Sequence, residues 1–247
     1  MDVNPLVQTI AIYALPVLFA ITLHEAAHGY VARHFGDMTA HAQGRISLNP
    51  LRHVDFIGTI VVPVIILILS SQKLLFGWAK PVPVNYSALK KPRQHMGLVA
   101  AAGPGANLLM AVIWAVMLRI FVSLTDRPAA WMDVAQNYGT GGLVEAVMRA
   151  GDGAAEFMIG VSAAGVLVNL VFMLLNLIPI LPLDGGRILA SLLPRRAAWR
   201  FAKLEPWGLP VLLLLLFVPV YGSNAISIIL SPLLFESEAL LRAMVQL

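Results

Sequence analysis

Long apolar runs separated by short polar loops dominate the chain. Five strongly apolar segments cover residues 6–31, 56–69, 97–121, 157–183 and 209–221, and a weaker sixth covers 225–235. A helix of about 20 residues crosses the hydrocarbon core of a bilayer. The first, third and fourth segments reach this length, whereas 56–69 is shorter and contains Pro63. The pattern predicts an all-α, multi-pass integral membrane protein with about five to six transmembrane or re-entrant segments.

Composition supports this interpretation. Hydrophobic residues make up 59% of the 247 residues, charged residues only 12%, and the mean hydropathy is +0.80. A soluble domain carries roughly a quarter charged residues. The net charge of +4 comes from basic residues beside apolar runs, so we attribute it to bilayer orientation and expect no nucleic-acid partner. We expect a single membrane-embedded domain over 1–247, with core helices at about 6–33, 97–123 and 155–183 and C-terminal membrane segments at about 207–235.

The loop charges predict the orientation of the chain. Residues 72–96 carry five cations and no acid, and residues 185–206 carry five cations against one acid. Residues 124–156 carry five acids against two cations. By the positive-inside rule the two basic loops are cytoplasmic and the acidic loop is outside. The third apolar segment therefore runs outward and the fourth runs inward.

Segment 56–69 conflicts with a simple crossing. The loop before it holds Arg33, Arg45 and Arg52 against Asp37 and Asp55, so both flanking loops are assigned to the cytoplasmic side. We expect a re-entrant or broken element, which a membrane protein tolerates where protein covers the backbone. The alternative is an ordinary helix that breaks the charge rule.

The first apolar segment ends in a metal-binding pattern. His24-Glu25-Ala26-Ala27-His28 matches H-E-x-x-H, in which helical spacing turns both histidines to one face so that they can hold one zinc ion. Glu25 is turned by about 100° from His24, which makes it a candidate base rather than a ligand. Ionisable residues in a membrane helix are costly unless they are paired or coordinating. The alternative is a solvated cluster at an interfacial helix end.

Asp184 is the candidate for a third ligand. A catalytic zinc ion takes three protein ligands and keeps one position for water, and without cysteines these ligands must be His or carboxylate. His24 and Asp184 both lie near the inward end of an inward-running segment, so we expect them at similar depth. Alternatively, Asp184 pairs with Arg187 or caps the helix that follows it.

These motifs resemble the site-2 protease family of intramembrane metalloproteases. The resemblance rests on HEAAH together with Asn176-x-x-Pro179 and Leu183-Asp184-Gly185, and extends over residues 21–189. Supporting matches are Gly103-Pro104-Gly-Ala-Asn107, Gly44-Arg-Ile-Ser-Leu-Asn-Pro50 and Gly77-Trp-Ala-Lys-Pro-Val-Pro-Val-Asn85. The chain looks like a compact member, because it leaves no room for an inserted PDZ domain or a CBS pair.

The resemblance implies a zinc-dependent endopeptidase. One zinc ion per chain would be held by His24, His28 and Asp184, with Glu25 as the catalytic acid/base. The substrate would be a single-pass membrane protein, cleaved at a peptide bond in or near its transmembrane segment. The enzyme would be an integral cell membrane protein within the lipid bilayer, with its active site towards the cytoplasmic side. The sequence does not indicate an oligomeric state.

Two asparagines and two short loop segments complete the candidate site. Asn176 is a candidate for hydrogen-bonding substrate or transition state, with interhelical packing as its alternative. Asn107 lies among small residues and is mainly a packing residue, with substrate contact as a weaker possibility. The β-like segments Arg45–Leu48 and Val82–Asn85 could hold an unwound substrate by strand addition.

Two other functions stay open at this point. A catalytically silent family member would act as a membrane binding module. A zinc transporter would also place ionisable residues in membrane helices. The complete His24, Glu25, His28 and Asp184 set argues against the first, and the Glu beside a two-His pair argues against the second.

Overall fold

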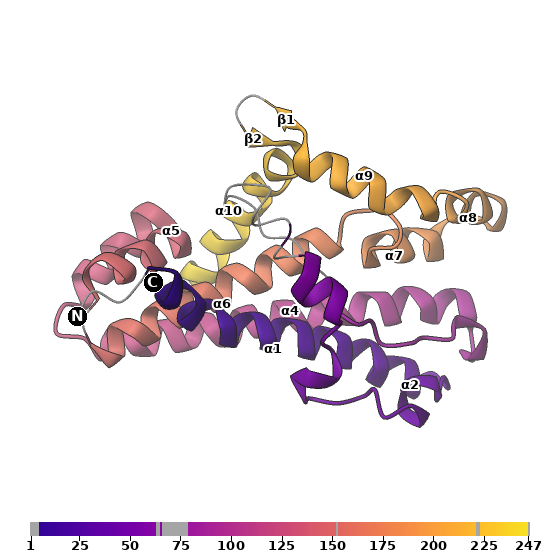
Figure 1. Cartoon of the computed structure of the whole chain (residues 1–247), viewed down its shortest axis with the longest axis horizontal. Helices are drawn as coiled ribbons and strands as arrows, with labels where there is room; N and C mark the ends of the chain where they lie inside the picture. The colour runs from indigo at the N-terminus through magenta and orange to yellow at the C-terminus, as the bar shows by residue number, and fades with distance from the viewer. Residues whose placement is uncertain (1–4, 63–64, 66–78, 152, 221–222, 247) are drawn as a thin grey trace.

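The structure is a computed structural model that describes residues 5–62, 65, 79–151, 153–220 and 223–246 (Figure 1). Three long helices form its body: α1 (Pro5–His34), α4 (Pro92–Ser123) and α6 (Ala154–Asn176). The other α-helices are α2 (Thr39–Ala42), α5 (Pro128–Ala150), α7 (Asp184–Leu192), α8 (Arg195–Ala202), α9 (Glu205–Phe217) and α10 (Ala225–Val245). Short turns are η1 (Pro50–Arg52), η2 (Phe56–Val61, a π-helix) and η3 (Tyr86–Ala88). Strands β1 (Pro219–Val220) and β2 (Ser223–Asn224) pair antiparallel, with Pro219 opposite Asn224.

Helices α1, α4 and α6 pack against one another, and α4 runs antiparallel to the other two. Along α1, the side chain of Asn107 reaches the carbonyl of Ala20, and further on the ring of His28 reaches the carbonyl of Val99. Along α6, Gly165 packs against Trp114 of α4, and further on Asn169 contacts Asn107. Helices α1 and α6 therefore run in the same direction, as predicted from the loop charges.

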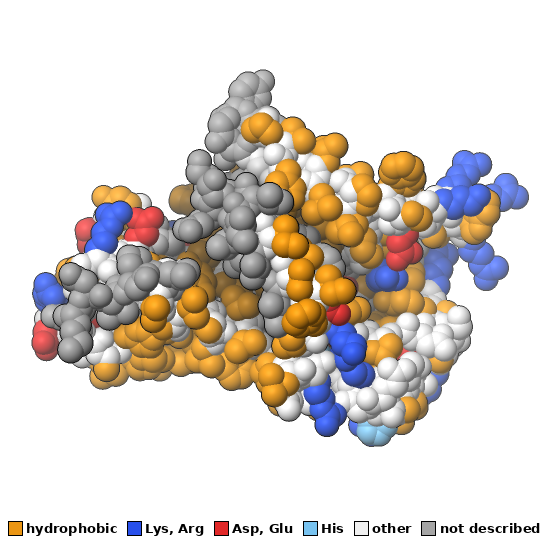
Figure 2. Space-filling model, viewed as in Figure 1, with side chains coloured by type: hydrophobic (Ala, Val, Ile, Leu, Met, Phe, Trp, Pro, Cys, Tyr) orange, Lys and Arg blue, Asp and Glu red, His pale blue; other side chains and the backbone are white. Residues whose placement is uncertain are grey.

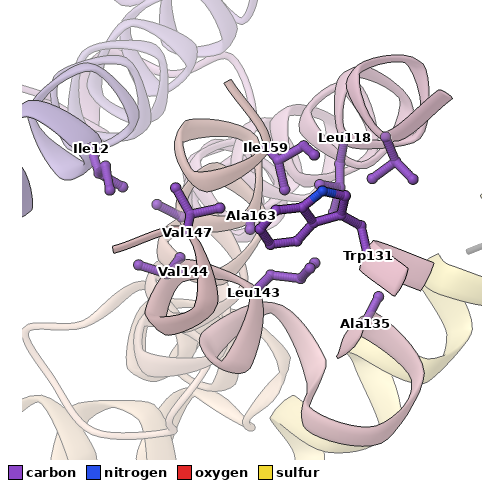
Figure 3. Close-up of a cluster of buried hydrophobic side chains, with 11 residues drawn as sticks. Ile12, Leu118, Trp131, Ala135, Leu143, Val144, Val147, Ile159 and Ala163 are labelled. Atoms are coloured by element: carbon purple, nitrogen blue, oxygen red, sulfur yellow. The ribbon is translucent and has the colours of Figure 1, made fainter. Parts of the chain in front are cut away.

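A buried apolar cluster joins the three long helices to α5 (Figure 3). Ile12 of α1, Leu118 of α4, Ile159 of α6 and Trp131 of α5 are all buried in it. Helix α5 is broken at Gly139, whose φ of 66° is readily adopted only by glycine. The sequence predicted only an acidic loop here. Helix α5 escaped prediction because its polar and glycine residues weaken the apolar periodicity.

The predicted number of membrane segments is not confirmed. Among the described residues, three helices are long and apolar enough to span a bilayer, and these are α1, α4 and α6. Helix α9 has only 13 residues, and α10 carries Glu236, Glu238 and Arg242. Most of the predicted segment 56–69 beyond the π-helix η2 lies outside the described residues, so its re-entrant path stays a prediction.

Two local predictions are corrected. Helix α6 ends at Asn176 rather than near residue 183, because Pro179 and Pro182 lack an N–H and disfavour helical geometry in the residue before them. The residues Arg45–Leu48 and Val82–Asn85, all described, form no strand. Pro83 removes one donor from the second segment, so a regular ladder cannot run along it.

Candidate metal centre

Three side chains converge at one point between the long helices. Nε2 of His24 lies 3.2 Å from Oδ2 of Asp184, and Nε2 of His28 lies 3.4 Å from the same oxygen. The two Nε2 atoms are 3.1 Å apart. In a tetrahedral zinc site with ligand bonds of 2.0–2.2 Å, ligand atoms are roughly 3.3–3.6 Å apart. The triangle therefore has nearly the size that one zinc ion requires.

The chemistry of the three atoms also favours a cation. Nδ1 of His28 lies 2.7 Å from the carbonyl oxygen of Val99, which can only accept, so the hydrogen of this ring is on Nδ1 and the lone pair is on Nε2. Oδ2 of Asp184 is buried and has no hydrogen-bond partner in the described structure. His24 and Asp184 are each only 8% exposed. Electron-rich atoms packed this closely away from water repel one another unless a cation lies between them. The residues thus fit the metal that the motif predicts.

Glycines make the convergence possible. Both histidines lie on one face of α1, and Gly103 of α4 faces them. A Cβ at position 103 would lie 2.5 Å from Cε1 of His24 and 2.5 Å from Nε2 of His28, so only glycine leaves room for both rings. After α6, the chain folds back and Asp184 becomes the first residue of α7. Gly185 packs directly on the carbonyl of Leu177 in this turn.

The alternative pairing of Asp184 with Arg187 is not observed. Nη2 of Arg187 lies 3.3 Å from Oε1 of Glu205, and its guanidinium is 5.2 Å from the ring centroid of Tyr86. Nor does the Asp184 side chain accept a capping hydrogen bond at the start of α7. Asp184 is therefore available to the two histidines.

Glu25 lies beside the triad of His24, His28 and Asp184 without joining it. Its Oε2 accepts a hydrogen bond of 2.7 Å from the backbone N–H of Val82. Val82 stands between Pro81 and Pro83, so its N–H is the single backbone donor of these three residues. Asp37 holds the same segment further along, because its Oδ2 accepts a 2.7 Å hydrogen bond from the N–H of Asn85. Two carboxylates thus anchor the loop over the site.

The candidate asparagines occupy different places. Asn176 is the last residue of α6, and its side chain donates to the carbonyl of Phe172 in its own helix. Asn107 is fully buried, with Oδ1 2.6 Å from Nδ1 of His24. Asn169, which is not among the residues predicted for the site, is also fully buried and contacts Asn107. A polar residue within the apolar run 157–183 was the signal that could have identified it.

Comparisons with known proteins agree with this geometry. The model of Peptidase family M50 matches residues 12–219. The chain is 36% identical over 209 residues to the protein named "Putative zinc metalloprotease YwhC" of Bacillus subtilis, covering 85% of this chain and 81% of that protein. It is 28% identical over 202 residues to "Putative zinc metalloprotease Rip2" of Mycolicibacterium smegmatis, covering 82% of this chain and 65% of that protein. No solved structure matches the chain.

The family match extends over most of the chain and includes all three residues of the triad. The matched region contains the membrane-length helices α4 and α6, most of α1 and the two histidines of H-E-x-x-H. It also contains Asp184, which is far from them in sequence but within 3.4 Å in space. The chain belongs to peptidase family M50, the site-2 protease family of zinc metalloproteases.

Proposed function

We propose that the chain is an intramembrane zinc-dependent endopeptidase. It hydrolyses a peptide bond in or near the transmembrane segment of a single-pass membrane protein. The observation that carries this proposal is the convergence of His24, His28 and Asp184 inside a bundle of membrane-length helices, with Glu25 beside them. One zinc ion per chain is the stoichiometry supported by the one such triad among the described residues.

The chain's own residues divide the chemistry among them. A bound zinc ion supplies Lewis acidity, which polarises a carbonyl and lowers the pKa of water. His24, His28 and Asp184 hold the ion. The carboxylate of Glu25 accepts the proton of the attacking water and delivers it to the leaving nitrogen. The N–H of Val82 keeps that carboxylate in one orientation.

The depth of the site supports cleavage within the membrane. His24 precedes the end of α1 at His34 by ten residues, which is about 15 Å of helix at 1.5 Å per residue. This distance is half of a hydrocarbon core of about 30 Å. Apolar side chains are exposed on the same helices, including Phe19 on α1 and Leu109 on α4. They suit contact with lipid.

Basic side chains support an orientation with the site towards the cytoplasm. Figure 2 shows Lys and Arg side chains gathered at the end of the bundle that carries α8, which holds Arg195, Arg196 and Arg200. Helix α1 also ends there, with Arg33 and His34 in its last turn. Excess positive charge is typical of cytoplasmic loops.

One experiment separates this function from its two rivals. The purified full chain in liposomes is mixed with a tethered single-pass substrate, and cleavage, zinc content and zinc flux are measured for wild type, Glu25→Gln and Glu145→Gln. We expect Glu25→Gln to keep its zinc and lose cleavage by about 10²–10⁴-fold. Glu145 is exposed on α5 and pairs with Arg149, so its variant should cleave like wild type. Zinc flux without cleavage by wild type would instead identify a transporter, and zinc binding with neither would identify a binding module.

A further inference from the structure

We propose that Asn107 and Asn169 form a relay that sets the tautomer and orientation of the ligand His24. The relay rests on the proposed metal centre, although it is independent of what the centre cleaves. It assigns both asparagines as positioning residues, since neither joins the triad. Asn107 therefore acts on the ring nitrogen of His24 that faces away from the triad, rather than on a substrate.

The relay joins three helices through buried polar contacts. Oδ1 of Asn107 on α4 lies 2.6 Å from Nδ1 of His24 on α1. Nδ2 of Asn107 donates to Oδ1 of Asn169 on α6 at 3.0 Å and to the carbonyl of Ala20 at 3.3 Å. Nδ2 of Asn169 donates to the carbonyl of Gly165 at 2.8 Å. Both asparagines are fully buried, so water does not compete for these bonds.

Two backbone carbonyls determine the direction of every bond in the relay. The carbonyls of Gly165 and Ala20 can only accept, so each must face an amide nitrogen. This orients Asn169 with its oxygen towards Asn107, and Asn107 with its oxygen towards His24. An amide oxygen also only accepts, so Nδ1 of His24 must carry the ring hydrogen. The lone pair of His24 is then on Nε2, which faces His28 and Asp184.

A reversed Asn107 would disable the ligand. Its amide nitrogen would face Nδ1 of His24 and select the tautomer with hydrogen on Nε2, and the Nε2 atom that faces His28 and Asp184 would then have no lone pair for a metal. His28 needs no such relay, because its Nδ1 donates directly to the Val99 carbonyl. The two histidines of one motif are therefore oriented by different means, one by backbone and one by side chains.

The relay also explains the spacing of Gly103 and Asn107. They are one helical turn apart on α4, and both face α1. Gly103 leaves room for the two imidazole rings, and Asn107 holds the far nitrogen of one of them. The Gly103-Pro104-x-x-Asn107 pattern thus serves the metal site from the neighbouring helix.

The first test measures zinc affinity of the full-length protein in detergent, by competition with a chelator. Loss of an outer partner of a metal-bound histidine weakens metal affinity by about 10–100-fold. We expect this loss for Asn107→Leu. Asn107→Asp keeps an acceptor for His24 and should stay closer to wild type, although it loses its donors to Ala20 and Asn169. The matched control is Thr22→Val, since Thr22 is buried on α1 near His24 and its hydroxyl has no described partner.

The second test reads the tautomer without metal or substrate. ¹⁵N NMR of histidine-labelled, metal-free protein should show His24 protonated at Nδ1 in wild type and a mixture of tautomers in Asn107→Leu. If Asn107→Leu does not fold, Asn169→Leu replaces it, because it removes the nearer of the two acceptors that orient Asn107, the other being the Ala20 carbonyl. Unchanged zinc affinity and tautomer in the folded variant would overturn the relay. So would an equal loss of affinity in Thr22→Val. Failure of wild type to cleave any substrate, with these results intact, would overturn only the proposed protease function.

Discussion

The backbone N–H of Val82 donates a 2.7 Å hydrogen bond to Oε2 of Glu25 across 57 residues of sequence. The prolines on either side cannot donate, so the loop offers this carboxylate one N–H from residues 81–83. The same bond removes this N–H from any pairing with a substrate strand. Strand addition at residues 82–85, where no strand is formed, therefore cannot use it while Glu25 is held.

Removing this N–H should slow cleavage without releasing zinc. Replacing Val82 by its α-hydroxy acid turns the amide into an ester and deletes only the donor. A hydrogen bond to a charged group contributes about 1.5–3 kcal/mol, so we expect a fall in kcat of about 10–100-fold. The control is protein made by the same nonsense-suppression method with valine, instead of its α-hydroxy acid, incorporated at position 82. An unchanged kcat would show that the bond does not position Glu25.

Gly103→Ala should abolish zinc binding. The added Cβ would lie 2.5 Å from atoms of both His24 and His28, which forces the rings apart. Gly105→Ala on the same helix is the matched control, because a Cβ there meets nothing within 4 Å. The zinc content of the two purified variants is measured, and we expect zinc in Gly105→Ala but not in Gly103→Ala. Equal zinc content in both would contradict the packing of α4 against the histidines.

Asp37 should make the loop over the site sensitive to acid. Burial raises the pKa of Asp37, but hydrogen bonds from Thr39 and from the N–H of Asn85 outweigh it and lower the pKa below its ordinary value. A lowered pKa stabilises the fold above the unfolded value of about 3.9, and this stabilisation is lost as pH falls through the folded pKa. Asp37→Asn should therefore lower Tm at pH 7, and the difference from wild type should shrink below about pH 4. A constant difference across pH would contradict this origin.

A buried ion pair within α10 should stabilise the carboxylate that contacts the break in α5. Oε2 of Glu238 lies 3.3 Å from Nη1 of Arg242 and accepts from the N–H of Thr140, next to Gly139. Removing one partner of a buried pair costs about 3–5 kcal/mol, whereas replacing both by apolar residues costs much less. Glu238→Leu should thus lower the free energy of unfolding far more than Glu238→Leu with Arg242→Leu. Equal losses in chemical unfolding would show that the pair is not coupled.

The convergence of His24, His28 and Asp184 was predictable from sequence, whereas their role as zinc ligands stays a prediction. Helical geometry places His24 and His28 on one face, and the loop charges bring Asp184 to the same depth. Their convergence within 3.4 Å agrees with both arguments.

The groups around the triad were harder to predict from sequence. Asn169 stands out as a polar residue in an apolar run, but its contact with Asn107 depends on the register of α6 against α4. The N–H of Val82 reaches Glu25 through the path of a proline-rich loop, which no local pattern specifies. Helix α5 was missed because its polar and glycine residues weaken the apolar periodicity, and its break at Gly139 depends on a contact of Thr140 with Glu238 of α10, which is far away in sequence. Tertiary contacts, rather than local preference, determine these features.

The most direct test of the proposed function is cleavage of a tethered single-pass substrate in H₂¹⁸O, with the new termini mapped by mass spectrometry. We predict fragments that end in or near the transmembrane segment, with one ¹⁸O atom in the new carboxyl terminus. Glu25→Gln, loaded with zinc, should give none. Fragments that end only in the soluble part of the substrate, or equal cleavage by Glu25→Gln, would contradict an intramembrane hydrolase with Glu25 as its base.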